Sequence, residues 1–541
     1  MKLRHMPLHS HWAHSLAAAL LLIVAGLPMT AQAEGEAAKE PVIAGEEEIA
    51  RLIAQLGHDR YVLREHAQAK LEKIGPPTFD ALTEALEHDD LEIANRARYL
   101  LGTIRFDWTS STDPKYIQEL LNEYAAKDES QRIEIINLLV QNGRDEELRV
   151  LCRIVRYDRS HRVSKRASLA LMFRSYLTSE ENQQKNELVL KQLTGVRRTA
   201  ARWYRTVAAA RANSEDAITE LESFASSEHA NLGTGEGNSG PDIVARLYYA
   251  LADTYRRLGK ADAANERAQM ALAAGGGHGE THLLIATDLQ ESGMIDWAAN
   301  EYRQAITLEP AGSPGVLQAH AQLAEMFHDQ DRIKQAVDVL KGLIKLLQRN
   351  PGNIPRPDRL IQRFEAQMNY MSALHFEKLG DVEKQAEALE KSASQWPDYP
   401  DTLIALYRLP NRTPEQRAQI VQNVKTTVDG YRLIMQNENR QGMADGQSQN
   451  QFAWLVGNTL GETDEKLAAE AIRASHRSLE LRPNSYAFTD TLARCYYASG
   501  DLETAINYQR EALSLNPHSG LLQRQLKQFE KELADKKQSE E

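Results

Sequence analysis

Residues 485–517 read SYAFTDTLARCYYASGDLETAINYQREALSLNP, and this stretch decides the fold. Its small residues and its final proline recur at a constant step of about 34 residues, from Ala471 to Ala505 and from Pro483 to Pro517. A constant step with small residues in phase predicts stacked helix-turn-helix units, because each unit buries its apolar face only against its neighbours. We therefore predict an all-α fold, an α-solenoid of stacked helical hairpins.

These hairpins resemble the tetratricopeptide repeat. In that family the first helix carries an aromatic residue, a leucine followed by a small residue, and a tyrosine, and the second helix carries alanines and a final proline. The copy that matches best has at these places Leu492, Ala493, Tyr496, Ala505, Ala512 and Pro517. The first copy has Tyr248, Leu251, Ala252, Tyr255, Ala264 and Ala271. The resemblance implies a repeat array over 241–350, a proline-rich break over 351–363, a divergent array over 364–520 and a capping helix over 521–541.

A different repeated sequence pattern occupies the N-terminal part of the chain. Asp90 stands between two helical patterns, and Arg96 and Ala97 follow one to two turns later. An acid at such a turn caps the second helix, and the arginine can reach the neighbouring unit. This phrasing resembles HEAT repeats, and the resemblance covers residues 46–175. A helical connector with a glycine-rich loop is expected over 176–240.

Residues 1–33 have the features of a secretory signal. Lys2 and Arg4 supply positive charge, an apolar run follows, and Ala31-Gln32-Ala33 forms a small-x-small cleavage site. The apolar run is too short to span a bilayer comfortably. We expect cleavage after Ala33, a linker over 34–45, and an exported protein in the periplasm or outside the cell. Membrane association is expected only if the signal segment stays uncleaved as an anchor.

Composition narrows the class of partner. The 541 residues are 42% hydrophobic and 26% charged, which is typical of a globular chain, and the formal net charge is −12. An acidic chain argues against nucleic acid as the partner, because phosphate backbones are bound by clustered lysine and arginine. The two cysteines, Cys152 and Cys495, lie in different repeat regions that a rigid solenoid keeps apart. We expect them to be packing residues rather than a disulfide.

Motifs that carry catalysis or bind a cofactor are missing from the sequence. Gly235, Gly237 and Gly240 spell G-x-G-x-x-G, but that fingerprint needs a preceding buried strand and a βαβ unit, and the flanking sequence is polar and helical. We interpret this stretch as a flexible connector. The histidines downstream of the signal are scattered singly, without the paired spacing of a zinc site. We predict no catalytic residue, no metal and no small-molecule cofactor.

Candidate ligand contacts follow from the family resemblance alone. In tetratricopeptide solenoids the groove is lined by residues of the first helices that do not pack against the second helices. The resemblance places in the groove Arg246, Tyr249, Asp253, Arg256, Leu283, Thr287, Gln290, Glu325, His328, Asp490, Arg494 and Tyr497. The lysine and asparagine clamp with which some family members hold a C-terminal carboxylate is missing. Each of these residues fits either a ligand contact or a solvated surface.

We predict from these features an exported, non-enzymatic repeat scaffold that binds partner proteins or peptides in the bacterial cell envelope. The alternative is an accessory subunit or an unrecognised enzyme that acts on envelope polymers, with Asp253 and Glu325 as its carboxylates. Paired catalytic carboxylates lie within roughly 10 Å of each other, so their placement separates the two hypotheses.

Overall fold

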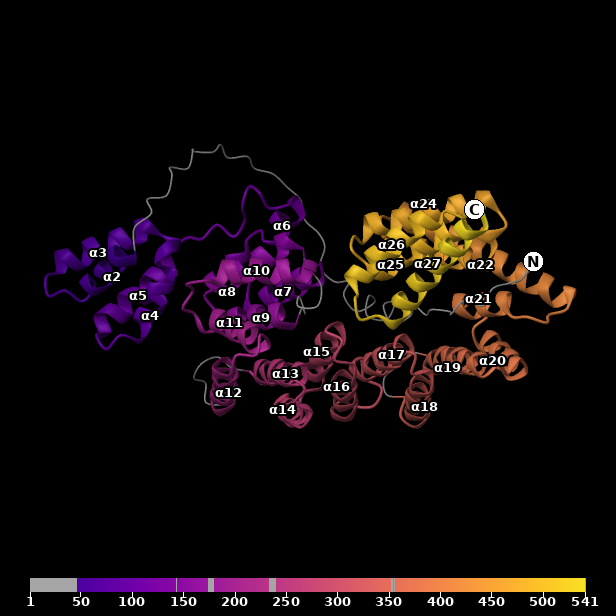
Figure 1. The fold of residues 1–541 in the computed structure, drawn as a ribbon, viewed down its shortest axis with the longest axis horizontal. Coiled ribbons are helices and arrows are strands. Elements are labelled where there is room, and N and C mark those ends of the chain that lie inside the picture. Colours follow the sequence, from indigo (N-terminus) through magenta and orange to yellow (C-terminus); the bar gives the residue numbers. More distant parts are fainter. Residues whose placement is uncertain are drawn as a thin grey trace. The chain divides into compact units, whose positions relative to one another are not determined.

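The computed structural model describes residues 46–540, except 143, 174–179, 233–239, 352–353 and 355. Over these residues the chain forms 26 α-helices and four short 3-10 helices, and it has no β-strand (Figure 1). The predicted all-α repeat solenoid is confirmed. The predicted signal peptide and linker lie outside the described residues.

The chain forms two compact units that divide between Gly277 and His278. The predicted proline-rich break at 351–363 does not coincide with this division. Pro357 is the first residue of a long helix in the C-terminal unit, because the fixed φ of proline and its missing N–H suit the first helical position. That helix packs on the helix before it, and the division between the two units instead falls within the predicted array over 241–350.

The N-terminal unit is a succession of short helices. They are α2 (Glu46–Gln55), α3 (Tyr61–Ile74), α4 (Phe79–Glu84), α5 (Leu91–Thr103), α6 (Lys115–Leu120), α7 (Glu129–Asn142), α8 (Asp145–Tyr157), α9 (His161–Phe173), α10 (Glu180–Leu193), α11 (Thr199–Arg211), α12 (Glu215–Ala230), α13 (Pro241–Arg257) and α14 (Ala261–Ala274). The 3-10 turns η1 (Pro76–Thr78), η2 (Ala85–Glu87) and η3 (Tyr124–Ala126) lie among them.

The first two hairpins make the contacts that their repeated sequence pattern predicts. The Asp90 carboxylate accepts a hydrogen bond from the backbone N–H of Glu92 at 2.8 Å and so caps α5. The Arg96 guanidinium donates to Glu65 at 2.8 Å and to Gln68 at 2.7 Å, both on α3. The cap and the bridge between hairpins are therefore both present, which agrees with the helical-repeat prediction for this region.

The C-terminal unit contains the longer repeat array. Its helices are α15 (Gly279–Glu291), α16 (Ile295–Leu308), α17 (Pro314–Asp329), α18 (Ile333–Arg349), α19 (Pro357–Leu379), α20 (Val382–Gln395), α21 (Pro400–Arg408), α22 (Pro414–Gln441), α23 (Gln447–Gly457), α24 (Glu465–Leu481), α25 (Tyr486–Ala498), α26 (Leu502–Leu515) and α27 (Gly520–Glu540), with η4 (Leu460–Glu462) after α23.

The quoted stretch forms the hairpin α25–α26. Gly500 has a φ of 86°, a left-handed conformation that glycine adopts without strain, and Asp501 then caps α26 through the N–H of Thr504. Ala493 and Ala505 are fully buried between the helices, together with Phe529 of α27. The small residues therefore lie where the helices approach closely, and α27 covers the end of the last hairpin, as the sequence predicts.

Candidate functional site

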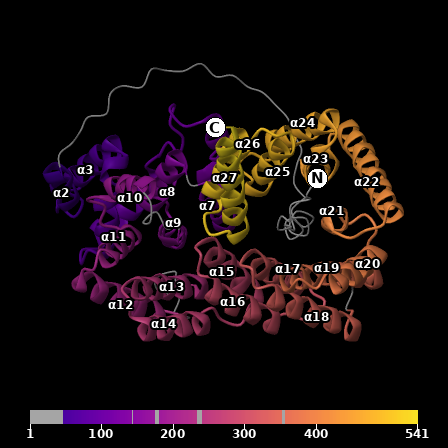
Figure 2. The same ribbon diagram turned by 45° about the vertical axis from the view of Figure 1, so that its right-hand side comes forward.

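The first helix of each hairpin in the C-terminal unit lies on its inner side. Figure 2 shows α17, α19, α21, α23 and α25 following one another there, with α18 and α22 outside them. We call these five helices the inner row. A ligand that binds in the manner of the family resemblance would meet the side chains of the inner row.

Contacts between neighbours run along the first part of the inner row. Gln367 of α19 donates its amide N–H to Glu325 of α17 at 3.0 Å. The Tyr370 ring of α19 packs edge-on against Tyr399, the N-cap of α21, with the ring centroids 5.6 Å apart. Each pair is drawn from successive hairpins, so these side chains fix the stacking of the repeats.

The second part of the inner row is joined in the same way. The indole N–H of Trp454 on α23 donates to the Asp401 carboxylate of α21 at 2.9 Å. Arg408 at the end of α21 donates to Asn458, the C-cap of α23, at 2.7 Å. The Cys495 thiol of α25 contacts a carbonyl oxygen of α23 at 3.4 Å. The inner row is therefore connected from α17 to α25.

Helix α27 returns to the start of the inner row. The Asp329 carboxylate at the end of α17 accepts from the Ser519 hydroxyl at 2.5 Å and from the backbone N–H groups of Gly520 at 3.1 Å and Leu521 at 3.4 Å. Arg524 donates to the carbonyl oxygen of Asp329 at 3.0 Å. We call this set the closing contact, because it joins the last helix to α17 and completes a circle.

Gln330 and His518 extend the closing contact. Gln330 donates its amide to the carbonyl oxygen of His518 at 2.8 Å. The His518 ring lies against Gly293 in the turn between α15 and α16, where a Cβ would come within 2.5 Å of the imidazole. Gly293 therefore serves its own left-handed turn, with a φ of 74°, and also the close approach of the last repeat.

Two buried carboxyl groups lie on the inner row. Burial raises the pKa of Asp401 to about 7, against the opposing hydrogen bond from Trp454. Burial likewise raises the pKa of Asp490 on α25 to about 7, although Gln509 and Gln525 both donate to it at 2.9 Å. Both groups therefore titrate near neutral pH.

Gln449 and Asn450, on the first turn of α23, have side-chain amides that are shielded from solvent and make no hydrogen bond within the described part of the chain. Their side chains are 3% and 0% exposed. The described residues provide no hydrogen-bond partner for the amide nitrogen or the amide oxygen of either. Buried polar groups are normally paired, and leaving one unpaired costs about 1–3 kcal/mol. We call these two residues the amide pair.

The local sequence fixes the amide pair in place. Gly446 precedes α23 with a φ of 87°, and a Cβ there would lie 2.9 Å from the carbonyl oxygen of Ser478 on α24. Only glycine allows this close approach, which sets the position of the first turn of α23. Sequence reasoning missed the amide pair as a site. The position of Asn450 within its repeat could have indicated the site, because Asn450 precedes the small residue Ala453 by the same number of residues as Asp490 precedes Ala493.

The predicted groove residues of α13 are held by the N-terminal unit itself. Arg246 and Tyr249 are buried, at 1% exposure each. The buried Asp253 carboxylate forms ion pairs with Arg211 at 3.0 Å, Arg256 at 2.6 Å and Arg257 at 2.7 Å. Burial opposes its charge, but the arginines outweigh burial and hold the pKa of Asp253 below its usual value. This carboxylate is a structural anion that joins α11 to α13.

The predicted residues of α15 are held within their own hairpin. Leu283 is buried, Thr287 donates its hydroxyl to the carbonyl oxygen of Leu283 at 3.0 Å, and Gln290 accepts from Tyr302 of α16 at 2.8 Å. The carboxylate pair of the alternative hypothesis is not assembled within either unit. Asp253 belongs to the N-terminal unit and Glu325 to the C-terminal unit.

The remaining predicted residues lie on the inner row. Glu325 and the buried His328 approach to 3.8 Å on α17. On α25, Arg494 donates to Glu462 of η4 at 2.8 Å and lies 4.3 Å from the ring centroid of Tyr497. The Tyr497 hydroxyl in turn donates to Glu532 of α27 at 2.7 Å. These residues therefore lie on helices of the inner row, where they link neighbouring repeats.

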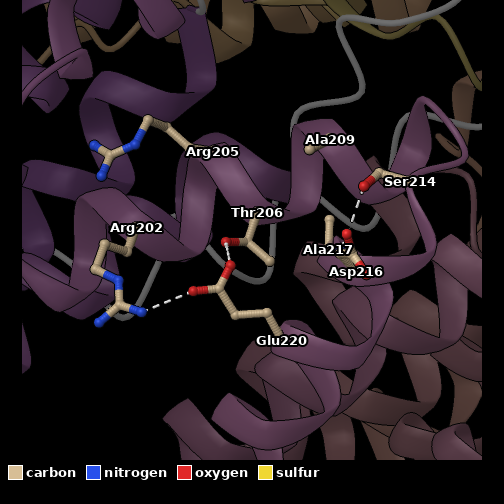
Figure 3. A pocket seen from close by; sticks show the side chains of 8 residues that line it. All are labelled: Arg202, Arg205, Thr206, Ala209, Ser214, Asp216, Ala217 and Glu220. Carbon is tan, nitrogen blue, oxygen red and sulfur yellow. Dashed lines mark hydrogen bonds and ion pairs between the residues drawn. The ribbon is translucent and has the colours of Figure 1, made fainter.

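A shallow pocket of about 540 Å³ lies along α11 and α12 in the N-terminal unit. Figure 3 shows Arg202 and Thr206 both directed at Glu220, at 2.7 and 2.8 Å. Arg205 donates to the carbonyl oxygens of Leu193 and Val196 instead. Arg202 and Glu220 therefore pair with each other and Arg205 is held by the backbone, so these three side chains are engaged within the protein.

No cluster of three or more His, Cys, Asp or Glu side chains suited to a metal ion occurs among the residues that the structure describes. In the same part of the chain no helix is long and apolar enough to cross a membrane. Cys152 and Cys495 are free and buried, and burial raises the pKa of both thiols to about 12. They are packing residues, as predicted.

Comparison with known proteins gives one family match. Residues 245–266 and 491–519 match the family model described as the tetratricopeptide repeat. No curated protein matches the sequence. The first matched segment falls on α13 and α14, and the second on α25 and α26.

Solved structures with similar folds are distant. Yeast Tom70 is 11% identical, over 88% of this chain and 89% of Tom70, with a TM-score of 0.30. The Cut9–Hcn1 hetero-tetramer of the APC/C is 14% identical, over 89% and 86%, with a TM-score of 0.25. The TPR2AB domain of yeast Sti1 in its pHSP90 complex is 14% identical, over 46% and 96%, with a TM-score of 0.18. TM-scores this low carry no argument about this chain. It is the family match that identifies residues 245–266 and 491–519 of this chain as tetratricopeptide repeats.

Proposed function

We propose that this chain is an exported, non-enzymatic repeat scaffold that binds a protein or peptide partner on the inner row of its C-terminal unit. One observation carries the proposal. The amide pair, Gln449 and Asn450, is buried on the inner row with no hydrogen-bond partner among the described residues. Two such groups cost free energy in the isolated protein, and a ligand that satisfies them recovers it.

The chemistry of the amide pair favours a polypeptide ligand. A primary amide has two N–H donors and a carbonyl acceptor, and a peptide group offers the complementary acceptor and donor. Each of the two amides can pair with one peptide group of an extended segment. The inner row adds groups of both charge signs, among them Glu325 and Arg494, which suits a partner with mixed side chains.

The proposed location rests on sequence features. The positive N-terminus, the apolar run and Ala31-Gln32-Ala33 support export with cleavage after Ala33, to the periplasm or the outside of the cell. The intact mass of the protein isolated from the cell envelope tests this step. A mature N-terminus at Glu34 supports export, and a retained Met1 in the cytoplasm rules it out.

The scaffold role is favoured over an enzyme that acts on envelope polymers. The carboxylate that this alternative needs at Asp253 is held by three arginines, so it is poorly suited to accept or donate a proton. A hydrolysis assay of the mature protein on purified envelope polymers tests the alternative, and release of soluble fragments would establish it.

The binding proposal has a direct test. The mature protein captures its partner from an envelope extract, and the purified partner is then titrated against the wild type and against Asn450→Leu. Leucine has the same number and branching of side-chain heavy atoms as asparagine and makes no hydrogen bonds. We expect partner affinity to fall about tenfold or more while the free energy of unfolding stays equal or rises, because a buried unpaired amide is removed. Gln419→Leu, at an exposed amide of α22, is the matched control. Unchanged affinity of Asn450→Leu would refute the proposal.

A further inference from the structure

The contacts that hold α27 differ on its two sides. Against α25 and α26 the helix is anchored by apolar packing, with Phe529 fully buried on Ala493, Ala505 and Ile506. Against α17 the described contacts are hydrogen bonds from Ser519, Gly520 and Leu521 to a single carboxylate, with Arg524 and Gln330 beside them. If α27 separates from α25 and α26, the whole free energy of apolar burial is lost. If it separates from α17, its hydrogen bonds are replaced by hydrogen bonds to water at a small net cost in free energy.

Asp329 is the centre of the polar side. Its carboxylate sits at the N-terminus of α27, where the helix dipole and the unpaired N–H groups favour negative charge. Ser519 links the two, because its hydroxyl donates to Asp329 and accepts from the N–H of Leu522 at 3.2 Å. The carboxylate at the N-terminus of α27 belongs to another repeat. Loss of this one side chain therefore removes the hydrogen bonds from Ser519, Gly520 and Leu521 to α17.

The closing contact joins the last helix of the array to the first helix of the inner row. In an open solenoid the inner surface is reachable from both ends of the array, but here the end of the array is fastened to α17. The amide pair on α23 lies within this closed circuit of contacts, fully buried. Because the amide pair is buried, a polypeptide reaches it only after some part of this circuit of contacts opens.

We propose that the closing contact is a releasable latch, centred on Asp329, that opens the C-terminal unit and admits a polypeptide to the amide pair. The identity of the ligand rests on the proposed function, but the opening itself does not. Its test therefore needs no ligand.

Opening is measured by the reactivity of a thiol placed at the amide pair. Asn450→Cys is labelled with iodoacetamide, and the protein without this substitution gives the background from the buried Cys152 and Cys495. When a buried site reacts only after opening, the labelling rate reports the population of the open state. We expect Asp329→Ala to raise the rate about tenfold or more, which corresponds to about 1.4 kcal/mol.

Matched controls separate opening from general destabilisation. Asp464 caps α24 through the N–H of Leu467 at 3.0 Å, so Asp464→Ala removes a cap away from the latch. Gly293→Ala forces His518 away, whereas Gly380→Ala places the same left-handed strain at a turn with no neighbour within 4 Å. Both latch variants should label faster than their controls, with unchanged circular dichroism.

Each result decides something. Faster labelling of Asp329→Ala and Gly293→Ala than of their controls supports the latch. Equal rates within both pairs overturn it, because opening would then not pass through this contact. If Asp329→Ala fails to fold, Gly293→Ala against Gly380→Ala decides alone. The proposed function is judged separately by Asn450→Leu, so the latch can stand when that proposal falls.

Discussion

The indole N–H of Trp454 donates a hydrogen bond to the Asp401 carboxylate across 2.9 Å, and this bond joins α23 to α21. Asp401 is 2% exposed, and its pKa is raised to about 7 because burial disfavours its charge. A carboxyl group that links two repeats and titrates near neutrality makes the stability of the inner row depend on pH.

We expect Asp401→Asn to remove part of that pH dependence. The folded unit retains a proton on Asp401 that the unfolded chain releases above its usual pKa of 3.8, so stability falls as pH rises from about 4 to about 7. The full effect is on the order of 4 kcal/mol. Thermal unfolding at several pH values should show a flatter profile for Asp401→Asn than for the wild type over that window. Parallel profiles would mean that Asp401 ionises as it does in water.

We expect Ala505→Trp to disrupt the C-terminal unit and to leave the N-terminal unit intact. Ala505 is fully buried between α25, α26 and α27, and overpacking such a site costs about 1–3 kcal/mol or more. Because the closing contact ties α27 to α17, faster hydrogen exchange should spread from α27 back to α15. Glu511→Trp, at an exposed position of α26, is the control. Faster exchange in residues 46–277 would show that the chain unfolds as one body.

We expect removal of residues 520–541 to reduce solubility. Terminal repeats of solenoids need a polar outer face, and α27 covers the apolar faces of Ala493, Ala505 and Ile506. Light scattering should rise and the melting temperature should fall relative to the full mature protein. Equal scattering and an equal melting temperature would show that α27 does not cap the stack.

We expect Asp253→Asn to destabilise the N-terminal unit by about 3–5 kcal/mol, because it leaves the buried Arg211 without its counter-charge. Chemical unfolding of the variant should show this loss, whereas Asp262→Asn, at an exposed position of α14, should have little effect. A stable Asp253→Asn protein would argue against the structural role and return Asp253 to the list of functional candidates.

The repeat period predicts the hairpins well, and the reason is local. Ala493 and Ala505 must be small because two helices meet there, and the same requirement returns in each copy. The period also places Asp490 and Arg494 on an inner helix. These features depend on neighbouring hairpins, so a single sequence reveals them.

The sequence did not predict which residues of the chain the candidate site residues contact. Arg211 lies in a region without a repeat signature, so its ion pair with Asp253 could not be anticipated. The amide pair lies in a divergent copy where the landmarks are weak. The contact of Asp329 with Ser519 depends on the small rotations of many hairpins added together, and no local pattern records that sum.

The circle also has a consequence for the order in which the chain becomes structured. In an open array of repeats, each hairpin that forms adds stability. The part of the chain that has already been synthesised can therefore fold while synthesis continues. Here the partner of Asp329 lies 190 residues later in the sequence, so the contact forms only after Ser519 has been synthesised. Such a long sequence separation slows the last step of folding. The C-terminal unit therefore closes only after all of its hairpins have been synthesised.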